Sequence, residues 1–352
     1  MSELVRAALA AVVDGKRLSM DEACAAMGSV MDGDATPAQL AALLVALRMR
    51  GETIEELAGF ASAMRERVVR VAAPAGAIDT CGTGGDHSGT FNISTTAALV
   101  VAAAGVPVAK HGNRAITSAA GSADVLEALG IRTDQTAEEA ADAIRTEGFA
   151  FLFAPGFHPA MKHAGPTRRE IGVRTAFNLL GPVTNPAGTS RQVIGVGDPI
   201  SAPKLAEVLR LLGSERALVV HGTGLDELPL DGTGVLYDVT PAGVIRSTVV
   251  AADLGLAAAP NSALAGGTAV ENAALVEEVL GGEAGPRRDV VLLNAAAGLL
   301  VAGRVTGLRE GIAMAAATID AGNARILLAR LRAAKTVHDA ARAGESMQGA
   351  PA

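Results

Sequence analysis

The chain has 352 residues, of which 49% are hydrophobic, and this is enough for two domains of ordinary size. Aromatic residues make up only 2%, with seven Phe, one Tyr and no Trp, which argues against modules that stack bases on aromatic platforms. The 30 basic and 37 acidic residues give a net charge of −7 and form no basic block, so we expect no nucleic-acid partner.

Residues 1–70 predict a small, all-helical domain. Their apolar positions recur at helical spacing. Three capping boxes, in which a Ser or Thr precedes a Glu or Gln by three residues, mark helix starts. They are Ser19…Glu22, Thr36…Gln39 and Thr53…Glu56.

From residue 72 the pattern changes to short apolar or β-branched runs, each followed by a glycine-rich turn and a helical stretch. The predicted strands are Ala77–Thr80, Val106–Lys110, Phe149–Ala154, Gln192–Val196 and Ala217–His221. Strands that alternate with helices predict an α/β domain with a mostly parallel central sheet. In such sheets, ligands bind at the carboxyl ends of the strands.

The stretch 160–190 interrupts this alternation with basic residues and the loop Asn178–Pro186. We interpret it as a return to the helical domain that forms one wall of an interdomain cleft. The large domain is then expected to consist of 72–158 and 190–352. Within it, Gly234–Val239 and Val244–Val250 predict a β-hairpin joined by the four residues between Thr240 and Gly243 inclusive.

A glycine-rich loop follows the first predicted strand and reads Gly82-Thr-Gly-Gly85-Asp86-His-Ser-Gly-Thr90. Free backbone N–H groups in such a loop, and at the helix start behind it, form an anion site. The spacing matches neither a Rossmann nor a Walker A motif, since His87 and Thr90 stand where a Gly and a Lys are required. Asp86 would repel a phosphate unless a magnesium ion or sugar hydroxyls lie between them.

The same loop has a simpler interpretation as a βα turn with Asp86 in solvent. Three polar residues then serve as ordinary caps of the next helix. They are Asn92, Ser94 and Thr95. Both interpretations stay open at this point.

A second loop with polar and basic side chains follows the next strand. It begins Lys110-His111-Gly-Asn113-Arg114 and continues to Gly121-Ser122. Because the ends of consecutive parallel strands lie close together, the two loops are expected to hold a pyrophosphate and a separate monophosphate.

The strand Ala217–His221 leads into a third loop with adjacent carboxylates, Asp226 and Glu227. On an irregular loop both can face one cation, and Mg²⁺ takes one or two carboxylates together with waters and substrate phosphates. The alternative is a solvated surface pair.

Arg168 and Arg169, expected at a helix start, are solvated residues unless they line the cleft. There, an arginine suits a carboxylate substrate because its guanidinium binds carboxylates in a bidentate manner. His158 and His163 have the same two interpretations.

The two cysteines, Cys24 and Cys81, form no short-range pair, which is typical of a reducing compartment and predicts a cytoplasmic protein. Glu3 and Arg6 interrupt the N-terminus, and the longest apolar run, 97–109, is shorter than the roughly 17 residues of a membrane span. We therefore expect neither a signal peptide nor a membrane anchor.

Taken together, the motifs resemble the anthranilate phosphoribosyltransferase family, in order and over most of the chain. They are Gly82-Thr-Gly-Gly-Asp86, Asn92-x-Ser94-Thr-Thr96, Lys110-His-Gly-Asn-Arg114, Gly121-Ser122, Arg168-Arg169-Glu170-x-Gly172, Asn178-x-Leu-Gly-Pro182, Asn185-Pro186 and Asp226-Glu227. The resemblance implies the two-domain fold of nucleoside phosphorylases and these transferases, with a small helical and a large α/β domain. It also implies a homodimer through the helical domains.

The implied reaction moves phosphoribose from phosphoribosyl pyrophosphate (PRPP) to the amine of anthranilate and releases pyrophosphate, in tryptophan biosynthesis. By resemblance, the residues that hold PRPP are Gly82, Gly85, Asp86, Thr90, Asn92, Ser94, Thr95, Lys110 and Ser122. Those that line the anthranilate path are Gly82, His111, Asn113, His158, Met161 and Arg168. Two magnesium ions are expected at Ser94, Asp226 and Glu227. The family often has Tyr in place of Met161.

We expect no catalytic acid or base, since the chemistry requires stabilisation of a departing pyrophosphate. Two other classes remain as alternatives. A pyrimidine nucleoside phosphorylase shares the two-domain plan, but its loop differs from Lys110-His-Gly-Asn-Arg114. A nucleic-acid binder on the same fold is opposed by the acidic balance.

Overall fold

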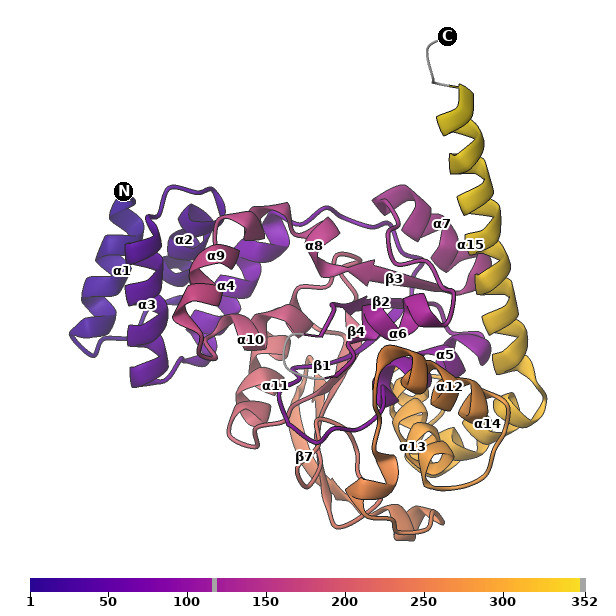
Figure 1. Cartoon of the computed structure of the whole chain (residues 1–352). Coiled ribbons are helices and arrows are strands. Elements are labelled where there is room, and N and C mark those ends of the chain that lie inside the picture. The colour runs from indigo at the N-terminus through magenta and orange to yellow at the C-terminus, as the bar shows by residue number, and fades with distance from the viewer. Residues whose placement is uncertain (116–118, 349–352) are drawn as a thin grey trace.

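Four helices form the N-terminal part of the chain (Figure 1). The computed structural model describes residues 1–115 and 119–348, with the backbone alone over 341–348. The four helices are α1 (Glu3–Val13), α2 (Met20–Met31), α3 (Pro37–Arg50) and α4 (Ile54–Glu66). All three predicted capping boxes form, since Ser19, Thr36 and Thr53 each accept a hydrogen bond from the backbone N–H three residues further on. The prediction of a helical N-terminal domain is confirmed.

One seven-stranded sheet lies at the centre of the rest of the chain, in the order β3-β2-β1-β4-β5-β6-β7. Its strands are β1 (Ile78–Gly82), β2 (Val108–Gly112), β3 (Phe149–Phe153), β4 (Arg191–Gly195), β5 (Arg216–His221), β6 (Gly234–Thr240) and β7 (Gly243–Val249). The pairs among β1 to β5 are parallel, and β6 and β7 add an antiparallel hairpin. The prediction of an α/β domain with a mostly parallel sheet is therefore confirmed.

Six of the seven predicted strands end one or two residues away from the observed end, and β5 ends where predicted, at His221. β1 continues to Gly82 and β2 to Gly112, because these glycines pair with β4 and β3 and so remain in the sheet. Thr240 pairs with Gly243, which leaves Pro241 and Ala242 as the turn of the hairpin. A local pattern assigns such residues to turns, but cross-strand hydrogen bonds decide where a strand ends.

Further α-helices follow α4 along the chain, some packed on the sheet and others against the N-terminal helices or one another. They are α5 (Ile93–Ala103), α6 (Ser122–Ala128), α7 (Ala137–Glu147), α8 (Ala154–Phe157), α9 (Gly165–Ile171), α10 (Phe177–Leu180), α11 (Ser201–Leu211), α12 (Ala269–Leu280), α13 (Pro286–Val301), α14 (Leu308–Asp320) and α15 (Asn323–Gln348). The described residues also form four 3₁₀ helices: η1 (Pro159–Lys162), η2 (Gly181–Val183), η3 (Ala251–Leu254) and η4 (Asn261–Leu264).

The side chains of β5 illustrate how the sheet divides the interior. Leu218 and Val220 point into a core that contains α5 and α13, while Ala217 and Val219 point into a core shared with α11 and the N-terminal helices. This alternation is what a strand buried on both faces requires.

The long helix α15 extends away from the body of the molecule at its C-terminal end (Figure 1). Among the described residues, no single helix has the length and apolar character to cross a membrane. Only α14 and α15 taken together meet that test, as a pair bent by 61°.

The connection from β3 to β4 reaches the N-terminal helices. α9 contacts α3, and α10 contacts α4. Phe177 and Leu180 of α10 share a core with Phe60 of α4, and Arg65 Nε donates to the Val183 carbonyl at 2.7 Å. The division of the chain into 1–70 with 160–190, and 72–158 with 190–352, stays a prediction.

The order of strands reverses at β1. The chain continues from β1 to β2 and β3 on one side, and then places β4 and β5 on the other. Connections that diverge in this way leave a crevice outside the carboxyl ends of the two central strands, where ligands bind in sheets of this type.

Candidate active site

The segment between β1 and α5, residues 83–92, forms a loop at this crevice, here called the glycine loop. Gly84, Gly85 and Gly89 have φ values of 61°, 71° and 65°, which glycine adopts readily and other residues rarely do. His87, at φ 56°, is the one non-glycine residue with positive φ in the described ranges. These left-handed positions allow the sharp turns of the loop.

Asn92 stands at the start of α5, but its side chain makes no capping hydrogen bond to the helix. Instead its Nδ2 donates to the Ala120 carbonyl at 3.4 Å, and its Oδ1 accepts from Asn272 Nδ2 at 2.9 Å. The interpretation of Asn92 as an ordinary capping residue is therefore wrong, because its amide joins three separate segments.

Asp226 reaches the glycine loop because β4, which lies between β1 and β5, ends in a glycine. A Cβ atom on Gly195 would lie 1.6 Å from the Asp226 carbonyl oxygen, and one on Gly82 would lie 2.3 Å from Asp226 Oδ2. Two small residues thus allow the loop after β5 to pass over β4. Asp226 Oδ2 then accepts from the Gly84 N–H at 2.9 Å, and the Asp226 N–H donates to Asp86 Oδ2 at 3.2 Å.

Three carboxylates meet at this position, and their charges oppose one another. The pKa of Asp226 is raised to about 6, mainly by burial and to a lesser degree by the negative charge of Asp86. Burial, followed by the charge of Asp226, raises the pKa of Glu227 well above its ordinary value. A cation would relieve both effects. The interpretation of Asp226 and Glu227 as a solvated surface pair is wrong.

The donor set suits magnesium rather than a softer metal. Carboxylate oxygens and the Ser94 hydroxyl are hard oxygen ligands, which Mg²⁺ prefers. In the part of the chain that the structure describes, no three His, Cys, Asp or Glu side chains form a complete metal site. Substrate phosphates and waters would have to supply the remaining ligands, as is usual for Mg²⁺.

Lys110 lies on β2, lines the same crevice as the glycine loop and is buried. Its Nζ donates to the Thr80 carbonyl at 2.5 Å. Burial lowers the pKa of Lys110, while the charge of Asp79 opposes that shift. Asp79 is itself fully buried, and its Oδ1 accepts from the His111 N–H at 3.1 Å.

Asp79 was not among the predicted site residues. The signal that was available is a carboxylate inside a predicted buried strand, four residues before the glycine loop. Burial raises the pKa of Asp79, and its Oδ2 has no hydrogen-bond partner among the described residues. Cys81 is held as a thiol because burial raises its pKa well above the ordinary value.

A pocket of about 550 Å³, here called the glycine-loop pocket, brings all the predicted PRPP and metal residues together. It is lined by Gly82, Gly85, Asp86, Thr90, Asn92, Ser94, Thr95, Lys110, Ser122, Asp226 and Glu227. Two further lining residues, Arg174 and Asn178, were not predicted to bind a ligand. The predicted loop continues through 116–118, which lie outside the described residues.

A second pocket of about 530 Å³ adjoins the first and contains all the predicted anthranilate residues. We call it the histidine pocket, and it is lined by Gly82, His111, Asn113, His158, Met161 and Arg168 among others. Gly82, His111 and Asn113 line both pockets.

Arg168 reaches the histidine pocket from the last turn of α9. The prediction that Arg168 and Arg169 lie at a helix start was wrong, because Pro166 allows α9 to begin earlier, at Gly165. The Arg168 guanidinium stacks on the Phe177 ring, with its carbon 4.6 Å from the ring centroid. Burial lowers the pKa of Arg168.

Two histidines form a direct pair in the histidine pocket. Nε2 of His111 lies 3.3 Å from Nε2 of His158, and both side chains are buried. Burial, and to a lesser degree the neighbouring His158, lowers the pKa of His111 to about 3. Burial lowers the pKa of His158 to about 4. Both imidazoles are therefore neutral at neutral pH.

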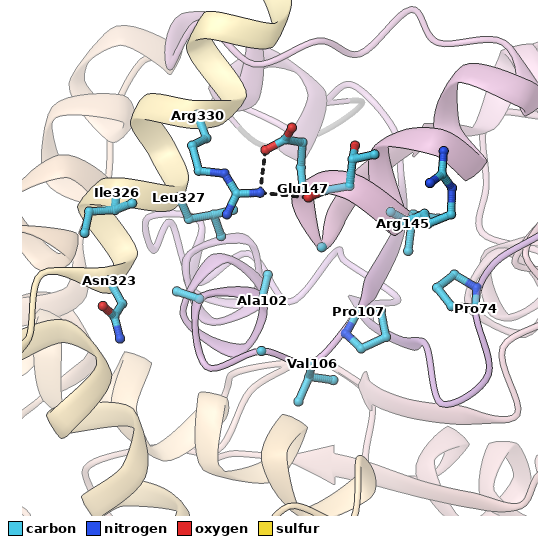
Figure 2. A pocket seen from close by; sticks show the side chains of 15 residues that line it. Pro74, Ala102, Val106, Pro107, Arg145, Glu147, Asn323, Ile326, Leu327 and Arg330 are labelled. Atoms are coloured by element: carbon cyan, nitrogen blue, oxygen red, sulfur yellow. Dashed lines mark hydrogen bonds and ion pairs between the residues drawn. The ribbon is translucent and has the colours of Figure 1, made fainter.

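A third pocket, of about 560 Å³, lies at the amino ends of the parallel strands, beside the residues that precede β2 and β3. Figure 2 shows the side chains that line it. Arg330 of α15 lies within 2.8 Å of both the Glu147 carboxylate and the Thr146 carbonyl at its rim. None of the predicted site residues lines this pocket.

Comparison with known proteins defines the class first. Residues 6–68 match the helical bundle domain of the glycosyl transferase family, and residues 75–325 match its a/b domain. The chain is thus a two-domain glycosyltransferase.

Relatives narrow this class to one family. The chain is 56% identical to the anthranilate phosphoribosyltransferase of Symbiobacterium thermophilum, over 93% of the chain and 97% of that relative. The solved structure of the enzyme from Thermus thermophilus superposes with a TM-score of 0.89, at 47% identity, and covers 94% of this chain and 99% of that one. The Saccharomyces cerevisiae enzyme, solved in complex with PRPP and Mg, gives a TM-score of 0.86 at 27% identity, over 96% and 99% of the two chains. The chain therefore belongs to the anthranilate phosphoribosyltransferase family, and the resemblance found in its motifs is confirmed.

Proposed function

We propose that this protein transfers the phosphoribosyl group of PRPP to the amine of anthranilate, giving N-(5-phosphoribosyl)anthranilate and pyrophosphate in tryptophan biosynthesis. One observation carries the proposal: a phosphate-type pocket and a mostly apolar pocket with a half-buried arginine, Arg168, adjoin at Gly82, His111 and Asn113. Their shared wall is where a sugar carbon and an aromatic amine would meet.

PRPP occupies the glycine-loop pocket. The backbone N–H groups of Gly85 and of the α5 start bind phosphate oxygens, since exposed N–H groups with the positive end of a helix favour anions. Side chains that hold the ribose and phosphates are Asp86, Thr90, Asn92, Ser94, Thr95, Lys110 and Ser122. Lys110 contributes its charge from below the loop.

Magnesium binds at Ser94, Asp226 and Glu227, with two ions in the complete site. Bound Mg²⁺ neutralises the negative charge that develops on pyrophosphate as the C1–O bond breaks. The raised pKa values of Asp226 and Glu227 support a cation at this place. Replacement of both by alanine is expected to lower kcat by about 10²–10³ or more. Retained turnover would remove them from the site.

Anthranilate occupies the histidine pocket with its carboxylate toward Arg168. The neutral imidazoles of His111 and His158, with Asn113, orient the ring and the amine without adding charge. Met161 forms part of the wall. The aromatic amine is neutral and nucleophilic, so it requires positioning beside C1 rather than a general base.

Fluorescence provides the direct test. Anthranilate emission is expected to decay only when protein, PRPP and Mg²⁺ are all present, and the absence of Trp keeps the protein's own emission low. No decay with a folded protein would overturn the proposal.

The protein acts as a homodimer through its helical domain. Apolar side chains on α1 and α3 support this, since Leu4, Val45 and Met49 are exposed, Met49 by 83%. Light scattering of the wild type is expected to give twice the chain mass. The Met49→Asp variant is expected to give a lower mass. A monomeric wild type would contradict the dimer.

The unpaired state of Cys24 and Cys81 supports a cytoplasmic location.

A further inference from the structure

Arg174 crosses from the β3–β4 connection to the glycine loop. It follows α9, its side chain is exposed, and its Nη1 donates to the Gly84 carbonyl at 3.0 Å. A Cβ atom on Gly85 would lie 1.6 Å from Nη1, so the guanidinium rests directly on the Gly85 backbone. It therefore lies at the mouth of the glycine-loop pocket, on one of the residues expected to bind phosphate.

The charges around this pocket make Arg174 distinctive. Asp86, Asp226 and Glu227 line the pocket, so an anionic ligand meets three carboxylates. Arg114 also lines it, but its guanidinium is engaged by two carboxylates, at 2.9 and 2.6 Å.

Lys110 is buried and donates to a carbonyl, with the Asp79 charge beside it. Among the side chains that the structure describes, those of residues 1–115 and 119–340, no ion pair engages Arg174, so its remaining N–H donors are available to an anionic ligand.

We propose that Arg174 is a PRPP-binding residue that contacts the pyrophosphate group. A guanidinium has five N–H donors, and the bond to Gly84 uses one of them, which leaves donors for a bidentate contact with a phosphate. Arg174 supplies positive charge beside Gly84 and Gly85, whereas Lys110 Nζ lies at the Thr80 carbonyl. Because pyrophosphate gains negative charge as it departs, the same contact stabilises the transition state.

This inference rests on the proposed function, and pyrophosphate binding tests it separately from turnover. Arg174→Ala is expected to raise the Kd of Mg-pyrophosphate, measured by calorimetry, and the KM for PRPP by about 10- to 100-fold, the effect of losing a hydrogen-bonded charge. Arg174→Lys is expected to restore part of both. The KM for anthranilate and the Tm are expected to stay near wild type.

Arg246→Ala is the matched control, since Arg246 is exposed on β7, at the far edge of the sheet. Competition by ribose 5-phosphate distinguishes the position of the 5-phosphate from that of the pyrophosphate. If Arg174→Ala weakened the binding of ribose 5-phosphate alone, the assignment of Arg174 to pyrophosphate would be overturned. An active wild type together with an unchanged pyrophosphate Kd in Arg174→Ala would overturn the inference. So would a lowered Tm with pyrophosphate affinity retained. An inactive wild type would instead contradict the proposed function.

Discussion

The side-chain amide of Asn272 holds that of Asn92. Asn272 Nδ2 donates to Asn92 Oδ1 at 2.9 Å, and Asn272 Oδ1 accepts from the Gly267 N–H at 2.7 Å. Asn92 in turn donates to the Ala120 carbonyl, so the network fixes which end of its amide faces each neighbour. A side chain on α12 thus orients a residue of the glycine-loop pocket.

Asn272→Asp is expected to keep the acceptor for Gly267 and remove the donor to Asn92. Because Asn272 is buried, the loss of partners costs about 1–3 kcal/mol of unfolding free energy. Asn92 is then free to turn, and the KM for PRPP is expected to rise more than the KM for anthranilate. Asn272→Ala removes both hydrogen bonds and is expected to unfold at a lower urea concentration than Asn272→Asp. Equal KM changes for the two substrates would limit Asn272 to a structural role.

Gly195→Ala is expected to displace the loop that carries Asp226. The added methyl would lie 1.6 Å from a backbone oxygen, which cannot move without its peptide. The expected cost is about 1–3 kcal/mol of unfolding free energy, together with a higher Mg²⁺ concentration for half-maximal rate. Gly307→Ala is the control, since nothing lies within 4 Å of a Cβ there. An unchanged Mg²⁺ dependence would contradict this account of the crossing.

Arg168→Ala is expected to raise the KM for anthranilate by about 10- to 100-fold, through loss of a charged hydrogen bond to the substrate carboxylate. The KM for PRPP is expected to change little, because Arg168 lines the histidine pocket and not the glycine-loop pocket. Steady-state kinetics with each substrate varied in turn gives both values. A uniform loss for both substrates would point to the stacking of Arg168 on Phe177 as the cause.

Acid is expected to destabilise the protein through the histidine pair. The folded-state pKa values, about 3 for His111 and about 4 for His158, lie below the ordinary 6.5, so the unfolded chain binds more protons. Their contribution is present above about pH 6.5 and is lost as the pH falls toward 4, by about 1.4 kcal/mol per pH unit for each histidine.

Urea unfolding at pH 7.5, 6 and 5 measures this slope. His158→Gln is expected to reduce the loss of unfolding free energy per pH unit. Asp226 makes an opposite contribution, because its raised pKa favours the folded state as acid is added, and this contribution cancels when the variant is compared with wild type. The same slope in both proteins would contradict the prediction.

Much of the architecture and of the site follows from local sequence. The capping boxes at Ser19, Thr36 and Thr53 form as predicted because a cap involves residues only three apart. Glycine-rich loops after successive strands predicted two phosphate-type sites, because parallel strands bring their carboxyl ends to one edge of the sheet. Every residue predicted for PRPP, metal or anthranilate lines one of two adjoining pockets.

Tertiary structure alone decided the contacts between distant segments. Asp226 meets Gly84 across 142 residues, Arg174 meets Gly84 across 90, and Asn272 meets Asn92 across 180. No periodicity or motif specifies such pairs, because they depend on strand order and on the space that Gly195 and Gly85 leave open. The sequence by itself therefore determined which chemical groups the site contains. The packing of the sheet determined which of them touch, and so where charge is left free for a substrate.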